Sequence, residues 1–419
     1  MKPSLQTLST VSKREQLTAY YMLAPALLIV FTVAIYPLGS GFINSFTNAT
    51  FASDRPSTFV GFRNYVNLVS IDVRFLRPLA TSATGKHEYP SASEVFHRME
   101  EFRISSASII KLGRIGVPPA ALTRLRAITG RSVRGPDAFN AEIERVLSPE
   151  FLPYVGKVLA AADRTAFRYS EIGQFTILST RVLIGARDPD FLVAAANTIA
   201  FAIITVVFET IFGLGLALLI NRKSPIQGVM RAVMLVPWAV PTAISSKIWE
   251  WMFSSTRIGF FNVIFQTFGL GNGQIPFLEL PNAQLPIMCV IDIWKTTPFM
   301  VLLILAGLQL IPRELYEASD VDGIGPVKQF WYVTLPLLRQ TIAVALVFRT
   351  LDALRVFDLF QIVLGESKYS LASFTYYQLI QSRAVGYSSA SGIIIFLIVF
   401  AFAIFYTRAL GINSDSELG

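Results

Sequence analysis

Charged side chains inside two long apolar stretches are the residues of this chain best suited to chemistry. The stretch 337–363 carries Arg349, Asp352, Arg355 and Asp358 at intervals of three, with alternating sign. Charges in hydrocarbon are costly, so they mark ion pairs, ion sites or substrate paths. Neighbouring members can pair along a helix, but each step of three turns back about 60°, so all four cannot line one cavity. Two interpretations remain open: an internal ion-pair ladder, or a polar path bordered by Arg349 and Asp352.

A second polar set lies in the sequence IDIWKTTPFM, within the apolar stretch 285–311. Asp292, Lys295, Thr296 and Phe299 follow the spacing i, i+3, i+4 and i+7, which places them on one side of a helix. Polar groups beside an aromatic ring suit a sugar, whose hydroxyls form hydrogen bonds while its apolar face stacks on the ring. Alternatively, Asp292 and Lys295 neutralise each other.

Candidates for catalysis and metal binding are scarce. His87 and His97 are the only histidines, and no second ligand set or nucleophile pattern accompanies them. The single cysteine, Cys289, excludes an intrachain disulfide and a thiolate metal cluster. The string TGKH at Thr84 lacks the upstream glycine of a Walker A loop. We expect no catalytic residue, no metal site and no ATP site here, and we expect Glu209 to have a structural partner on another helix.

The composition indicates that membrane-spanning helices position these residues. Of the 419 residues, 53% are hydrophobic and 15% are charged, well away from the averages for soluble domains. The expected fold class is an all-α polytopic membrane protein. Stretches that can cross a hydrocarbon core of roughly 30 Å predict six spans, near residues 18–43, 191–220, 230–253, 285–311, 337–363 and 389–409. The first span is too long for a cleaved signal peptide.

Short basic segments predict the orientation. Lys13 and Arg14 precede the first span, and Arg222 and Lys223 follow the second, so both segments belong in the cytoplasm. The 36 Lys and Arg against 28 Asp and Glu are scattered, which fits membrane orientation rather than nucleic-acid binding. Six crossings place both termini in the cytoplasm.

The segment after the first span is too long for a connector and is predicted to lie outside. It contains helical signals such as SASEVFHRMEEF and GPDAFNAEIERVL, separated by proline and glycine. We expect a small, mostly helical extracytoplasmic domain at about 71–187. The predicted division is a cytoplasmic N-terminus (1–17), a first span (18–46), an extracytoplasmic segment (47–189), a core with five further spans (190–410) and a cytoplasmic tail (411–419).

A polar stretch between the fourth and fifth spans reads EASDVDGIGPVKQFWYVTLP from Glu317. It predicts a helix, a break and a second helix. Pro312 can sit in the first turn of the first helix, Gly323 suits its C-terminal cap, and Pro326 can begin the second. The loop 312–336 is therefore predicted to be a cytoplasmic docking surface.

This stretch resembles the EAA loop of permease subunits of binding-protein-dependent ABC importers, with Ser319 and Ile324 as modest departures. VGFRNYVNL, VPWAVPTAISSKIWEWMF, WKTTPFMVLLILAGLQLIPRELYEA and FRTLDALRVFD are similar to the carbohydrate branch, which includes the maltose permease larger subunit and the trehalose and glycerol-phosphate permeases. The resemblance covers 15–70 and 188–410, and residues 71–187 replace a short connector. The loop residues that carry it are Glu317, Ala318, Ser319, Asp322, Gly323, Phe330, Leu335 and Pro336.

The resemblance implies a membrane importer assembled from several chains. This chain would form half of a sugar path, beside a second homologous permease, two ATP-binding subunits and an extracytoplasmic substrate-binding protein. ATP and Mg²⁺ would bind only the ATPase subunits, to which those loop residues would couple. The location implied is a bacterial or archaeal plasma (inner) membrane, in contact with lipid. The substrate path would include Asp292, Lys295, Thr296, Phe299, Arg349 and Asp352.

Three other interpretations are weighed. In an ion-coupled secondary carrier, the intramembrane acids would be ion sites. An ABC permease can also carry a non-sugar solute such as a glycerol-phosphate compound. A membrane hydrolase would use Asp352 and Asp358, which diverge by about 120° on a helix. We expect the insertion to contact the binding protein, or else to be a lineage-specific decoration or lid.

Overall fold

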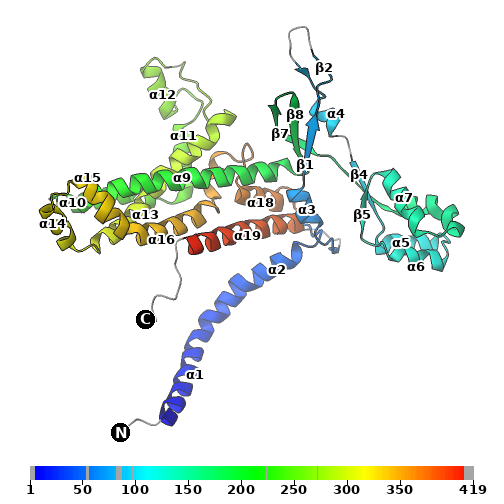
Figure 1. Ribbon diagram of the computed structural model, residues 1–419, viewed down its shortest axis with the longest axis horizontal. Helices are drawn as coiled ribbons and strands as arrows, with labels where there is room; N and C mark the ends of the chain where they lie inside the picture. Colours follow the sequence, from blue (N-terminus) through cyan, green and yellow to red (C-terminus); the bar gives the residue numbers. More distant parts are fainter. Residues whose placement is uncertain are drawn as a thin grey trace. The chain divides into compact units, whose positions relative to one another are not determined.

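The computed structural model describes residues 5–52, 56–81, 87–96, 99–222, 224–270 and 272–409. The chain forms two compact units (Figure 1). We call Met1–Val66 with Val193–Gly419 the membrane unit, and Asn67–Leu192 the insertion unit. His97 and the TGK of the TGKH string lie outside the described residues.

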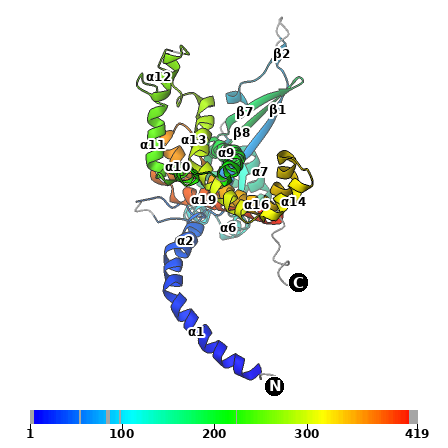
Figure 2. The ribbon, with the colours of Figure 1, turned by 90° about the vertical axis from the view of Figure 1, so that its left-hand side faces the viewer.

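The described part of the membrane unit is built of helices (Figures 1 and 2). Helix α13 packs against both α10 and α16, and α16 also contacts α19. The elements are α1 (Leu5–Val30), η1 (Phe31–Ile35), α2 (Tyr36–Asn44), α9 (Pro189–Asn221), α10 (Gln227–Ala239), α11 (Thr242–Met252), α12 (Phe260–Thr267), α13 (Pro281–Gln309), α14 (Arg313–Val321), α15 (Pro326–Gln329), η3 (Phe330–Thr334), α16 (Leu335–Ala353), α17 (Asp358–Val363), α18 (Leu371–Ile380) and α19 (Val385–Ala409).

Four helical stretches of the described chain are long and apolar enough to cross a membrane. They are Leu17–Asn44, Pro189–Asn221, Pro281–Gln309 and Val385–Arg408, and they coincide with the first, second, fourth and sixth predicted spans.

The other two predicted spans are broken. The third falls on α10 and α11, which bend by 86° where Pro241 removes a backbone donor and pushes Val240 out of helical geometry. The fifth is interrupted between Ala353 and Asp358. The count of six spans therefore remains a prediction.

Helices α9 and α13 approach closely because a glycine stands at their contact. A Cβ atom on Gly213 would lie only 2.8 Å from the Cβ of Met300. Around this contact the buried side chains are aliphatic and include Val301 and Ile304, both fully buried. Small residues at such positions allow helices to pack tightly within a membrane.

The insertion unit combines helices with antiparallel sheets. The strand orders are β1-β8-β7, β2-β3 and β5-β4-β6. Helix α3 (Arg63–Val69) leads into this unit. The other elements are β1 (Ile71–Leu76), β2 (Ala80–Thr81), β3 (His87–Glu88), α4 (Ala92–Val95), β4 (Met99–Arg103), α5 (Ser106–Arg114), α6 (Pro119–Arg126), β5 (Ser132–Arg134), α7 (Pro136–Val146), η2 (Pro149–Tyr154), α8 (Val155–Ala161), β6 (Asp163–Phe167), β7 (Ser170–Ile177) and β8 (Thr180–Ala186).

The expectation of a mostly helical insertion is therefore wrong. GPDAFNAEIERVL does form α7, but SASEVFHRMEEF forms only the single turn of α4 before strand β4 begins. Phe102 of β4 is buried and stacks on Phe139 of α7, with ring centroids 5.3 Å apart. Glu100 and Glu101 instead pair with arginines. Strands this short and this charged do not show the alternation that identifies a half-buried strand.

Replacing Gly213 with alanine tests the close approach of α9 and α13. The added methyl group must displace Met300, so the free energy of unfolding in detergent should fall by about 1–3 kcal/mol. Gly215 of the same helix is the matched control, because a Cβ there meets no atom within 4 Å. Gly215→Ala should be neutral or stabilising, since alanine favours helix by about 1 kcal/mol. Equal effects of the two variants would contradict the packing described.

Candidate functional site

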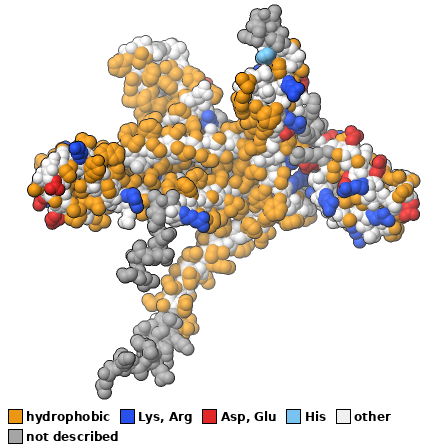
Figure 3. Space-filling view, viewed as in Figure 1, with side chains coloured by type: hydrophobic (Ala, Val, Ile, Leu, Met, Phe, Trp, Pro, Cys, Tyr) orange, Lys and Arg blue, Asp and Glu red, His pale blue; other side chains and the backbone are white. Residues whose placement is uncertain are grey.

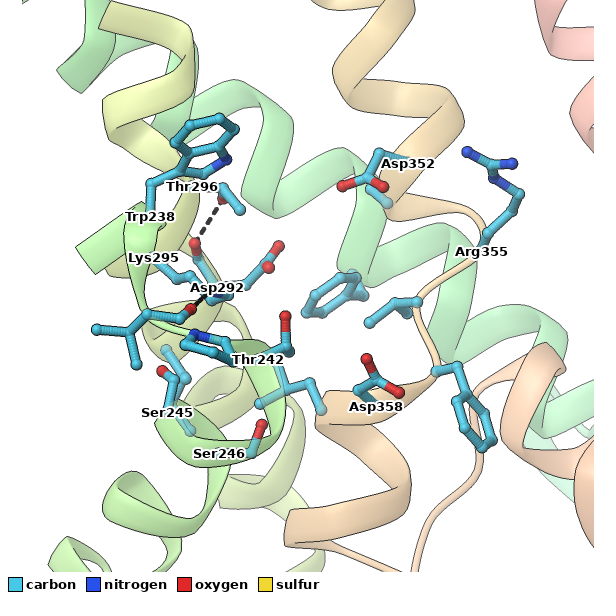
Figure 4. Close-up of a pocket in the computed structure, with 18 of the residues that line it drawn as sticks. Trp238, Thr242, Ser245, Ser246, Asp292, Lys295, Thr296, Asp352, Arg355 and Asp358 are labelled. Carbon is cyan, nitrogen blue, oxygen red and sulfur yellow. Dashed lines mark hydrogen bonds between the residues drawn. The ribbon is translucent and has the colours of Figure 1, made fainter. Parts of the chain in front are cut away.

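A cavity of about 470 Å³ opens in the membrane unit beside α10, α11, α13 and α16 (Figure 4). Five of the six predicted substrate-path residues line it: Asp292, Lys295, Thr296, Arg349 and Asp352. The sixth, Phe299, is not among the lining residues. It stacks on Trp238, which does line the cavity, with ring centroids 6.0 Å apart and an interplanar angle of 23°.

Arg349 joins three helices beside this cavity. Its side chain is 2% exposed. The guanidinium donates to Glu209 of α9, with Nη2 3.0 Å from Oε1, and to Asp292 of α13. Nη1 also donates to Asp352 Oδ2 of its own helix at 3.1 Å. The expected partner of Glu209 on another helix is thus confirmed as Arg349, and this cluster ties α9, α13 and α16 together.

Lys295 and Asp292 do not simply neutralise each other. Asp292 is paired with Arg349, whereas Lys295 Nζ donates to the carbonyl oxygen of Val240 at 2.6 Å. Val240 is the last residue before Pro241, where the helix is broken and carbonyl groups lack partners within the helix. The Thr296 hydroxyl lies within hydrogen-bonding distance of Glu209 and, at 2.6 Å, of the Asp292 carbonyl oxygen. Lys295 therefore stabilises the bend that shapes the cavity.

The predicted ladder of four charges is confined to its first step. Arg349 and Asp352 pair, but α16 ends at Ala353. Beyond that point Arg355 Nε donates to the Leu351 carbonyl oxygen at 3.1 Å. Because the helix breaks, the prediction that the four charged residues cannot all line one cavity is wrong: Arg349, Asp352, Arg355 and Asp358 line the same cavity. Figure 4 shows Asp352, Arg355 and Asp358 around it.

Seven residues of the third predicted span line the cavity and were not predicted as site residues, and Trp238, Thr242, Ser245 and Ser246 are the ones with polar or aromatic side chains (Figure 4). Ser245 is 2% exposed and Ser246 is 1% exposed. Neither hydroxyl has a hydrogen-bond partner among the described residues. A buried polar group without a partner costs about 1–3 kcal/mol, so such groups mark places that take a ligand or water. The signal that would have found them is the proline-flanked sequence PWAVPTAISS, which breaks an apolar stretch.

The loop 312–336 forms the predicted helix, break and second helix. Helix α14 ends in a Schellman motif, with Gly323 at φ +72°. The Gly323 N–H donates to the Asp320 carbonyl at 3.1 Å, and the Ile324 N–H donates to that of Ser319 at 2.9 Å. Pro326 begins α15 as expected, while Pro312 is the cap residue just before α14.

Gln329 braces the two arms of this loop. Its amide Nε2 donates to Ser319 Oγ at 2.6 Å and lies 3.2 Å from Asp320 Oδ1. The Tyr316 hydroxyl also bridges to Thr334 Oγ1 at 3.1 Å. Ser319 is consequently buried, and it supports the loop from within rather than offering a small contact surface.

The remaining predicted coupling residues lie nearer the loop surface. Glu317, Ala318, Asp322, Gly323 and Pro336 are exposed, and Phe330 and Leu335 are half-buried. Trp331 and Tyr332 add exposed rings, at 59% and 75% exposure. Through the π-helical turn η3 the second arm continues directly into α16. The helix that carries Arg349 therefore begins in the loop.

These features define a class of protein: an α-helical membrane protein with a polar cavity among its helices and a braced helix–break–helix loop on one of them. Residues 209–412 match the family model described as "Binding-protein-dependent transport system inner membrane component".

Several characterised relatives share about half of this chain. It is 42% identical over 217 residues to the trehalose/maltose transport system permease protein MalF of Thermococcus litoralis, covering 50% of this chain and 72% of that one. It is 39% identical over 227 residues to the sulfoquinovosyl glycerol transport system permease protein SmoG of Agrobacterium fabrum, covering 53% and 73%. It is 34% identical over 224 residues to the trehalose transport system permease protein SugA of Mycobacterium tuberculosis, covering 52% and 69%. The chain belongs to the family of binding-protein-dependent transport system inner membrane components.

Removing the charge of Arg349 tests the three-helix cluster. In Arg349→Met, Glu209 remains buried without its cation, so the free energy of unfolding should fall by about 3–5 kcal/mol. Lys247→Met is the control, because the Lys247–Glu250 pair is exposed and should contribute less than about 1 kcal/mol. Adding Glu209→Gln to Arg349→Met should recover part of the loss. An Arg349→Met protein as stable as the Lys247→Met control would contradict this account of the cluster.

Proposed function

We propose that this chain is a permease subunit of an ATP-driven, binding-protein-dependent importer for a sugar or related carbohydrate. The observation that carries the proposal is the cavity. Its volume is within the range of small-molecule sites, about 300–1,000 Å³. It offers the indole ring of Trp238, which stacks on Phe299, together with the hydroxyls of Ser245 and Ser246, which have no partner among the described residues. The three relatives support the same substrate class, since their names specify trehalose, maltose or sulfoquinovosyl glycerol.

The cations at the cavity favour a neutral sugar over a phosphorylated one. Arg349 is bonded to three carboxylates, Lys295 is directed at a backbone carbonyl, and Arg355, the third cation of the lining, donates its Nε to the Leu351 carbonyl. Asp352 and Asp358 also line the cavity, where carboxylates accept hydrogen bonds from sugar hydroxyls but repel a phosphate. A glycerol-phosphate compound is the second candidate substrate, and it is disfavoured on these grounds.

We further propose that the loop 312–336 is cytoplasmic and couples the chain to a separate ATPase. Two ATP-binding subunits would hold ATP and Mg²⁺ and perform the hydrolysis, so that no covalent chemistry occurs on this chain. The exposed residues of α14 and α15 would contact one ATPase subunit, and Gln329 would keep the arms rigid. Because α16 starts in the loop, a displacement there would reach Arg349 and, through it, α9 and α13. Such movement would expose the cavity alternately to the two sides of the membrane.

The proposed assembly includes a second homologous permease and an extracytoplasmic binding protein. The exposure of the first span supports a partner within the membrane. In the most apolar 18-residue stretch of Leu17–Asn44 no residue is buried against this chain, whereas 56% of the residues are buried in the corresponding stretch of Pro281–Gln309. Only α2, at the end of this span, packs against α19, so most of its apolar surface is available to lipid and to a second subunit. Family membership also disfavours an ion-coupled secondary carrier, since that mechanism requires no binding protein.

The substrate proposal is tested by sugar uptake into vesicles that contain the assembled importer. With trehalose or maltose as the probe, Trp238→Ala should raise the KM roughly tenfold, which corresponds to about 1.4 kcal/mol of lost contact. Trp294→Ala is the matched control, because Trp294 lines a separate apolar groove and its loss should leave the KM unchanged. Transport of glycerol phosphate but of neither sugar would refute the substrate class.

The coupling proposal is tested at the glycine of the loop. Gly323→Val should abolish substrate-stimulated ATP hydrolysis while the permease pair still assembles, because a β-branched residue is strongly disfavoured at φ +72°. Gly325→Ala should preserve stimulation, since φ there is −68° and an added Cβ meets no atom within 4 Å. If the Gly323→Val importer kept full substrate-stimulated ATP hydrolysis, the loop 312–336 would have no role in coupling.

A further inference from the structure

A second cavity of the membrane unit, of about 440 Å³, lies at the C-terminal end of α11. Its volume is also within the range of small-molecule sites. We call it the outer pocket and define it by six of the residues that line it: Lys247, Glu250, Trp251, Ser254, Ser255 and Glu279. None of these six lines the cavity beside Arg349.

Helix α11 directs three of these side chains to one side. Lys247, Glu250 and Trp251 follow the spacing i, i+3 and i+4, which places them on one face of the helix. Lys247 Nζ donates to Glu250 Oε2 at 2.6 Å, and Trp251 is 53% exposed. The ion pair keeps the Glu250 carboxylate on the face that carries the indole ring.

The connection that follows α11 forms the other walls, and it is held in place from within. The Asn262 amide donates to the carbonyl oxygens of Ser254 and Ile275, at 2.8 and 3.1 Å, and its Oδ1 accepts from the Ile275 N–H at 2.8 Å. Asn262 is fully buried. At the base, Phe253 lines the pocket and stacks on Phe261, with ring centroids 4.3 Å apart. The outer pocket therefore lies between fixed segments.

The outer pocket combines groups that recognise a neutral sugar. An exposed indole offers a flat apolar surface to the apolar face of a sugar ring. Among the described residues the Glu279 carboxylate has no partner, so both oxygens can accept hydrogen bonds from sugar hydroxyls, and such charge-assisted bonds are the stronger ones. The Ser255 hydroxyl can donate or accept. With two carboxylates and one ammonium group, the lining is negative and disfavours a phosphate.

Anchoring at the membrane surface would explain only part of this set. Tryptophan and lysine are common at the boundary between membrane and water. On the face drawn in Figure 3, hydrophobic side chains cover most of α11 and α12. Carboxylates have no such anchoring use, yet Glu250 and Glu279 both line the outer pocket. A ligand with several hydroxyls accounts for the acids and the indole together.

Helix α11 also connects the outer pocket to the cavity. Thr242, Ser246 and Glu250 stand four residues apart, so they form one row along the helix. The first two line the cavity and the third lines the outer pocket. At 1.5 Å per residue, Ser246 and Glu250 are separated by about 6 Å along the helix axis. A row of polar side chains thus leads from one site to the other.

The order of the helices places the outer pocket on the side opposite the loop 312–336. Figure 1 shows α10 and α14 at the same end of the membrane unit, and α13 runs to that end because α14 follows it directly. The outer pocket belongs to the connection between α10 and α13. With the loop in the cytoplasm, this connection faces the extracytoplasmic side, from which an imported sugar arrives.

We propose that the outer pocket is an entry subsite, which binds a neutral sugar on its way into the cavity. This inference rests on the proposed function, which supplies both the substrate class and the orientation. The Trp251 indole and the Glu279 carboxylate hold the sugar, and the polar row of α11 leads it to Ser246.

The test measures sugar uptake into vesicles that contain the complete importer, with a binding protein loaded with trehalose or maltose as the donor. Trp251→Ala combined with Glu279→Gln should lower the maximal rate of uptake at least fivefold, because the sugar loses its first site. The concentration of loaded binding protein that gives half-maximal uptake should change less than twofold. The matched control combines Phe268→Ala with Glu366→Gln. It removes an exposed ring and an exposed carboxylate outside the pocket and should change neither quantity.

Two single variants separate stacking from a structural role. Trp251→Phe keeps an aromatic face and should retain at least half of the maximal rate, whereas Trp251→Leu keeps apolar volume only and should not. Unchanged uptake in the Trp251→Ala, Glu279→Gln importer would overturn the subsite. So would a rise in the half-maximal concentration of binding protein as the only effect, which indicates a protein contact, or loss of the second permease on purification, which indicates a subunit contact. An unaltered importer that transports neither sugar would instead refute the proposed substrate class.

Discussion

The membrane unit depends on one buried cation. Arg349 is enclosed by carboxylates from α9, α13 and its own helix, and neither it nor Glu209 is exposed beyond 2%. Charges with so little access to water persist only where they are paired and hydrogen-bonded. The requirement is mutual, because each helix supplies a group that the others need. It fixes the relative rotation of three helices that otherwise share an aliphatic cluster, including Val301 and Ile304, whose contacts are far less directional.

The same cluster explains how a polar cavity can exist among apolar helices. Arg349 is committed to acids and Lys295 to the carbonyl of Val240, so these two cations of the wall are satisfied by the protein itself. Among the described residues of the wall, the buried side-chain groups without a partner are neutral: the hydroxyls of Ser245 and Ser246. A site built in this way can exchange hydrogen bonds with a polyhydroxy ligand without the larger cost of desolvating a free ion.

Parts of this arrangement were predictable because local chemistry determined them. Gly323 and Pro326 specify a break at one place for backbone reasons alone, and long apolar stretches specified α9 and α13. Two parts were not predictable. The end of α16 at Ala353 is marked by neither proline nor glycine, so periodic charges suggested a continuous helix and a ladder. The strands of the insertion unit were hidden because Glu100 and Glu101 find arginine partners that are remote in sequence, and such tertiary contacts leave no local pattern.

The pairing of Ile71 with Ala186 has a consequence for the history of this chain. The first and last strands of the insertion unit are neighbours in one sheet, so the backbone leaves and returns at nearly the same point. A segment with adjoining ends can be gained, lost or exchanged without altering the distance between the helices on either side. The insertion unit is thus a cassette, and its lineage need not be that of the permease core that carries it.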